Sequence, residues 1–270
     1  MRSKISAAIN RHWLAAPLAI WGKLPSHGDF LKHGTSAAQA QDWQDWVARV
    51  WSQRPAARTT PRSQGTVDAE RGWLTLEPRK AVADLAMVPV AFVMQPGAMP
   101  FSPRHCVQGV MVASQDQVGR ACPLIIFQQV APGWLRRSWA GSQARSHHDL
   151  LYWLARIAAR AHAADRDWQD LADTVDAVWM AHAPNWRHAM GAPLPTPSST
   201  QLDALVRGYC AHDTADSARG LHGVQRMPWV NWPTQIVRAD HPVHAFWQQD
   251  MRGGYVNVGD SLPKLWGVQA

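Results

Sequence analysis

Gly109–Val130, GVMVASQDQVGRACPLIIFQQV, is the stretch around which the rest of the chain is organised. It contains two apolar runs, Val110–Ala113 and Leu124–Phe127, separated by the polar connection Ser114–Arg120. Short runs rich in Val and Ile, bounded by turn-forming residues, are typical of buried β-strands. Because the connection is short, the two strands are expected to pair in the antiparallel sense. The stretch therefore predicts a β-hairpin in the core with a polar connection at its rim.

Three residues define the expected shape of this connection. Gly119 can adopt the positive φ that a tight return needs, and Asp116 can accept a hydrogen bond from its own backbone. Pro123 has no N–H to give to a sheet, so it fits the first position of a strand. Polar groups at the rim of a rigid element often form binding sites, which makes Asp116 and Arg120 candidate site residues.

Around the hairpin the sequence predicts one sheet covered by helices. Trp43, Trp46 and Val50 recur at helical spacing after an N-cap at Thr35 or Ser36, which predicts an amphipathic helix with its tryptophans in the core. By the same criteria, further strands are expected near 17–21, 88–94 and 255–258, and further helices within 73–85, 150–161, 168–179 and 201–209. We therefore expect an α/β (α+β) fold, with a central, mostly antiparallel sheet and helices on both faces, as a three-layer sandwich.

The predicted domain organisation has three parts. Residues 1–16 are expected to form a loosely attached N-terminal extension, and residues 17–190 the α/β domain. The Pro- and Ser-rich stretch at 190–200 is a break in the pattern, and residues 191–270 are expected to pack on the same domain as a C-terminal segment.

Composition narrows the class of protein. The chain has 270 residues, 46% of them hydrophobic, sixteen tryptophans and a formal charge of +7. The basic residues are scattered, which argues against nucleic-acid binding. Three cysteines, Cys106, Cys122 and Cys210, stand far apart without a C-x-x-C pair, so neither a disulfide framework nor a zinc site is expected. No apolar run suits a signal peptide or a membrane span, and the expected location is the cytoplasm.

No catalytic motif stands out. The chain has no G-x-S-x-G, H-E-x-x-H or G-x-x-x-x-G-K-[ST]. His241 and His244 have helical spacing but no third ligand nearby, and Cys122 is expected to be an inert buried thiol. We therefore expect no enzyme activity, no cofactor and no metal.

A second loop complements the hairpin connection. Trp21–Phe30, WGKLPSHGDF, predicts a strand that leads into a loop of fixed path, because two glycines and a proline fall within it. Since both loops hang from strands of one sheet, Lys23, Asp29, Asp116 and Arg120 are expected to lie close together. The residues assigned to partner binding or loop fixing are Lys23, Pro25, Asp29, Phe30, Asp116 and Arg120. Those assigned a structural role are Gly22, Gly28, Trp43, Trp46, Gly119 and Pro123.

Two roles remain open for the charged cluster. It is either an internal lock that fixes the loops or a surface that recognises a partner, and the two are not exclusive. Solvent exposure distinguishes them, because a buried pair favours the lock and an exposed charged rim favours recognition.

The two loops also carry a resemblance. WGKLPSHGDF at 21–30 resembles the opening signature of the TagF family, accessory proteins of bacterial type VI secretion systems. Gly109–Ser114, Asp116, Val118–Arg120 and Pro123–Leu124 are similar to a later block of that family. The chain departs where Ala91 follows Pro89 and Val90, since the family usually has an aromatic residue there. It also lacks the Asp-Gly motifs of the phosphatase domain that is fused to some relatives.

The resemblance implies a non-catalytic cytoplasmic regulator that represses type VI secretion after translation. Its implied partner is the forkhead-associated-domain protein of the same secretion system, with no nucleic acid and no membrane span. Two alternatives are a structural or assembly subunit of the secretion baseplate and an uncharacterised hydrolase. Co-purification with baseplate proteins would favour the first, and a pocket of converging carboxylates or histidines the second.

Overall fold

A computed structural model describes residues 14–50, 89–142, 150–161, 167–189, 197–210, 244–249, 255–259 and 261–262. The helix predicted within 73–85, residue His241 and residues 1–13 of the predicted extension lie outside these ranges.

The centre of the fold is one seven-stranded sheet in which every neighbouring pair is antiparallel. Its strand order is β2-β1-β5-β4-β3-β6-β7. The strands are β1 (Ala19–Gly22), β2 (Leu31–His33), β3 (Val90–Met94), β4 (Cys106–Val112), β5 (Leu124–Val130), β6 (Ala245–Gln249) and β7 (Tyr255–Gly259).

The predicted hairpin forms the middle of this sheet. β4 and β5 pair along their whole lengths, from Cys106 opposite Val130 to Val112 opposite Leu124. β4 begins four residues before the predicted Val110, and nearly every side chain of the pair is buried. A strand buried on both faces reads as a continuous apolar run rather than an alternating one. Val110–Val112 and Leu124–Phe127 read this way, whereas Gln108, Gln128 and Gln129 interrupt the apolar pattern of the same strands.

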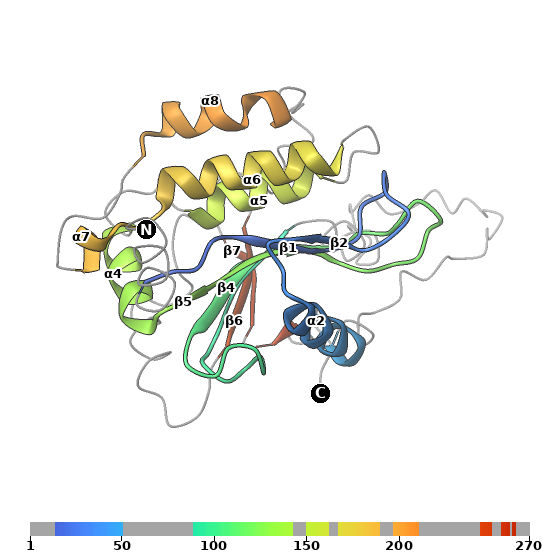
Figure 1. Ribbon diagram of the computed structural model, residues 1–270, viewed down its shortest axis with the longest axis horizontal. Coiled ribbons are helices and arrows are strands. Elements are labelled where there is room, and N and C mark those ends of the chain that lie inside the picture. The colour runs from blue at the N-terminus through green and yellow to red at the C-terminus, as the bar shows by residue number, and fades with distance from the viewer. Residues whose placement is uncertain are drawn as a thin grey trace, which may run out of the picture.

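Helices cover one face of the sheet, seen above it in Figure 1. These are α5 (Leu150–Arg160), α6 (Trp168–His182) and α8 (Ser199–Cys210), with α4 (Pro132–Ser142) and the short α7 (Trp186–Ala189) towards one end. Leu154, Ile157 and Val175 of these helices belong to the same cluster of buried apolar residues as Val110 and Ile126 of the hairpin. The spacing of the apolar residues along each helix directs one face to the sheet.

Within the described ranges, one long helix, α2 (Ala37–Val50), covers the opposite face (Figure 1). Ser36 and Gln39 cap its start reciprocally, each side-chain oxygen accepting from the other residue's backbone N–H. Trp43 is fully buried and its ring meets those of Phe92 and Phe127 edge-on, whereas Trp46 is partly buried. The expected three-layer sandwich is therefore confirmed.

Several features differ from the sequence-based expectations. β2, β6, α4 and α7 were not predicted. Leu14 and Ala15 are buried rather than loose, because the backbone at 14–16 bonds to Gln129 and Ala131 at the end of β5.

Within residues 191–270, α8 packs on α5 and α6, and β6 pairs with β3. The described parts of this segment thus belong to the same body.

Candidate functional site

Two loops lie side by side at one end of the sheet, one from β1 to β2 and the other from β4 to β5 (blue and green in Figure 1). The sheet topology brings them together, because β1 pairs with β5 and Trp21 lies opposite Ile125. The end of β1 therefore meets the start of β5, and the connections on either side project in the same direction.

The carboxylate of Asp116 is the centre of this pair of loops. Its Oδ2 accepts from Lys23 Nζ at 2.9 Å and from Arg120 Nε at 2.6 Å. Its Oδ1 accepts from the backbone N–H groups of Val118, at 3.1 Å, and Arg120, at 2.8 Å. Asp116 is only 1% exposed. A buried carboxylate needs such partners, because an unpaired buried charge is strongly unfavourable.

The partners of Asp116 also decide its protonation. Burial by itself raises the pKa of the carboxyl group, because it disfavours the charged form. Hydrogen bonds from Lys23 and Arg120, together with the Arg120 charge, outweigh that effect and hold the pKa of Asp116 well below its ordinary value. Asp116 is therefore ionised at neutral pH and acts as a fixed acceptor rather than as a proton donor.

Further contacts tie the two loops directly to each other. Arg120 Nη2 donates to the Gly28 carbonyl at 3.0 Å, and the Gln117 N–H donates to the His27 carbonyl at 3.0 Å. The Lys23 ammonium lies 4.8 Å from the centre of the Phe30 ring. The loops are thus held as one unit by main-chain and side-chain bonds.

Exposure separates the charged residues into two groups. Lys23 is 5% exposed, so the Lys23–Asp116 pair is buried, and a buried pair favours the role of an internal lock. The Arg120 side chain is 63% exposed, and Gly28 and Asp29 are also exposed. The outer side of the same unit therefore presents charge to solvent.

The structure brings together three of the four charged residues expected to meet. Asp29 does not join the cluster as predicted, because its Oδ1 instead accepts from the next backbone N–H, that of Phe30, at 2.7 Å. Pro25 lies half-buried in the same loop, and the Phe30 ring stacks on Trp21 at 5.3 Å.

Two glycines shape the loops. Gly22 has a φ of 134°, and a Cβ there would lie 2.8 Å from Leu124 Cα and closer still to the Pro123 carbonyl oxygen. Gly119 has a φ of 85°, the left-handed region that the predicted tight return needs. Both positions favour glycine for backbone reasons.

Sequence reasoning overlooked Val118 at the tip of the β4–β5 loop. Its side chain is 72% exposed, in the middle of the residues that the lock holds. The available signal was one β-branched apolar residue within an otherwise polar connection, but the prediction for this connection considered only its polar residues.

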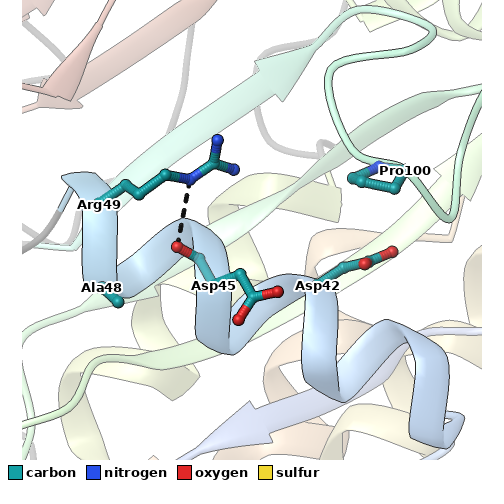
Figure 2. A pocket seen from close by; sticks show the side chains of 5 residues that line it. All are labelled: Asp42, Asp45, Ala48, Arg49 and Pro100. Carbon is teal, nitrogen blue, oxygen red and sulfur yellow. Dashed lines mark hydrogen bonds between the residues drawn. The ribbon is translucent and has the colours of Figure 1, made fainter.

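Other parts of the described chain offer weaker candidates for a functional site. A depression of about 490 Å³ beside α2 is lined by Asp42, Asp45, Ala48, Arg49 and Pro100. Arg49 Nε donates to the Asp45 carbonyl (Figure 2). Within the described ranges, no three His, Cys, Asp or Glu side chains gather as metal ligands.

The described cysteines and helices add two further findings. Burial raises the pKa of the Cys106 and Cys122 thiols to about 12, so both are protonated and unreactive at neutral pH. None of the helices that the structure describes has the length and apolar character needed to cross a membrane.

Comparison with known proteins assigns the central part of the chain. The model of the TagF N-terminal domain, described as type VI secretion system-associated, matches residues 76–178. This segment contains the β4–β5 loop with Asp116 and Arg120, and the β1–β2 loop precedes it. Among solved structures, the chain is similar to PA0076 from Pseudomonas aeruginosa PAO1 at 17% sequence identity and a TM-score of 0.46, covering 93% of this chain and 92% of that one. No curated protein matches the chain.

Proposed function

Because the chain belongs to the TagF family of type VI secretion-associated proteins, we propose that it is a non-catalytic cytoplasmic regulator of such a system. It represses secretion after translation by binding the forkhead-associated-domain protein of the same system. The two locked loops form the binding edge.

The observation that carries this proposal is the division of the two-loop unit into a buried lock and an exposed rim. Lys23 and Asp116 are buried and fix the loops, while Asp29, Gln117 and Arg120 face solvent. A surface that is ordered before it meets its partner loses less conformational freedom on binding, and more of its contact energy appears as affinity. Lys23 and Asp116 are therefore positioning residues, and Arg120 and Asp29 are contact residues.

A binding titration tests the proposal. The purified chain is titrated against the forkhead-associated-domain protein of its own secretion system, and saturable binding at micromolar concentration or below is expected. Arg120→Ala should weaken binding. Arg136→Ala is the matched control, because Arg136 is an exposed arginine on α4, beyond the opposite end of β5. It should bind as wild type does.

Folding is checked for each variant by circular dichroism. Because Arg120 also bonds to Asp116, a second variant, Asp29→Ala, removes an exposed rim charge and leaves the Lys23–Asp116 pair intact. Absence of wild-type binding at high micromolar concentration would overturn the proposed partner. Equal loss of affinity in the Arg120 and Arg136 variants would overturn the assignment of the binding edge.

A further inference from the structure

We infer that Val118 is the apolar anchor of the binding edge, and that it inserts into an apolar pocket on the partner whose rim carries an acidic group facing Arg120. This inference rests on the proposed function. It adds two points: which residue dominates the contact, and what chemistry the receiving surface of the partner has.

The first observation is the exposure of Val118. It is 72% exposed, and among the described residues the only other exposed large hydrophobic side chains are Met180 at 73% and Leu205 at 39%. Single exposed apolar residues are common on protein surfaces and by themselves indicate nothing. What distinguishes Val118 is the way its backbone is held.

Every backbone N–H from residue 117 to residue 120 is already bonded within the two-loop unit. Gln117 donates to the His27 carbonyl, and Gly119 donates to the Asp116 carbonyl at 2.9 Å. Val118 and Arg120 donate to the Asp116 carboxylate. The tip therefore cannot turn Val118 inward without breaking bonds to a buried, ionised group. The loop holds an apolar side chain out in water, and it is ordered before any partner arrives.

The residue beside Val118 indicates what surrounds the receiving pocket. The Arg120 guanidinium is held by Asp116 through Nε and by Gly28 through Nη2, yet its side chain remains 63% exposed. Arginine is one of the residue types enriched among interface hot spots, which lie in well-packed pockets that become fully desolvated on binding. An ordered apolar side chain beside an oriented arginine can supply the desolvated contact that such a pocket needs. The formal charge of +7 on the chain further favours an acidic surface on the partner. The exposed Gln115 and Gln117 complete a polar rim.

The test compares two exposed apolar residues under the same substitution. Val118→Asp and Met180→Asp are titrated against the same forkhead-associated-domain protein as wild type. Both sites are equally exposed, so neither variant should change the midpoint of thermal unfolding. We expect Val118→Asp to raise Kd by at least about tenfold, as loss of a hot-spot residue does. Met180→Asp, on α6, should bind as wild type does, and Val118→Leu should retain binding because the anchor remains apolar.

The outcomes separate the two proposals. If wild type binds and Val118→Asp binds equally well, the anchor is wrong and the proposed function stands. If Val118→Asp and Met180→Asp lose affinity equally, the effect is one of net charge and the anchor is again wrong. If wild type itself does not bind the forkhead-associated-domain protein, the proposed function and the anchor both fall.

Discussion

Replacing Gly109 by alanine should force apart the two central strands of the sheet. Gly109 in β4 lies between Phe92 of β3 and Phe127 of β5. A Cβ at this position would lie 2.8 Å from Phe127 Cα and closer still to the Ile126 carbonyl oxygen. Both neighbours are backbone atoms and cannot rotate away as a flexible side chain would. The added methyl group is accommodated only if β4 and β5 separate.

The expected loss of stability follows from that contact. Overpacking a tight core costs about 1–3 kcal/mol, and each hydrogen bond lost from the ladder between the strands adds about 1 kcal/mol. Since the clash lies near the middle of the seven-residue β4–β5 pairing, strand separation cannot be confined to a frayed end. We expect Gly109→Ala to lower the free energy of unfolding by about 3 kcal/mol. For a chain of this size, that corresponds to a decrease in Tm of roughly 6–12 °C.

Thermal unfolding followed by near-ultraviolet circular dichroism is the appropriate assay. It reports the packing of Trp43 on Phe92 and Phe127, whose ring centres lie 5.9 and 5.2 Å away. Gly208→Ala is the control, because no neighbouring atom lies within 4 Å of a Cβ added at that helical position. The same chemical change there should raise stability by about 0.5–1 kcal/mol. A Gly109→Ala variant with the Tm of wild type would refute the close approach of the two strands.

Two further predictions concern the titration of buried groups. The pKa of Asp116 is lower in the folded state than in the unfolded state, so its charged form stabilises the fold. This stabilisation is complete above the ordinary carboxyl pKa of about 3.9. It is lost as the pH falls below that value and through the folded-state pKa. The difference in Tm between wild type and Asp116→Asn should therefore be constant near neutral pH and shrink under acid conditions, and a difference that persists into strong acid would contradict the ion-pair account. Burial raises the pKa of the Cys106 and Cys122 thiols to about 12. In a Cys210→Ser variant at mildly alkaline pH, a chromogenic disulfide reagent should therefore label neither thiol of the native protein and both thiols after denaturation. Rapid labelling of the native protein would show that the thiols are accessible.

The sequence predicted those parts of the fold that bury a regular apolar pattern. The runs at Val110–Ala113 and Leu124–Phe127 became the central hairpin, and the periodic tryptophans of α2 face the sheet as expected. β2 escaped prediction because three residues, of which only Leu31 is buried, carry no periodic signal. β6 has five residues, and its place in the sheet depends on pairing with the distant β3. Local patterns do not encode such pairings.

The sequence predicted which residues belong to the candidate site better than it predicted how their side chains are arranged. Tethering both loops to one sheet was enough to bring Lys23, Asp116 and Arg120 together. The direction of the Asp29 carboxylate was not predictable, because an aspartate in a loop can bond as readily to the next N–H as to a neighbouring loop. The outward position of Val118 depends on four backbone hydrogen bonds, one of them to residue 27, and such a network is visible only in three dimensions.

The strand order also has a consequence during synthesis of the chain. β3 consists of five buried residues, VAFVM, and its outer neighbour is β6, which begins at Ala245. Until the ribosome has produced β6, β3 is an apolar edge strand with unpaired backbone groups, and such edges recruit strands from other molecules. Nascent chains, and fragments cut between β5 and β6, are thus the forms of this protein most prone to aggregate.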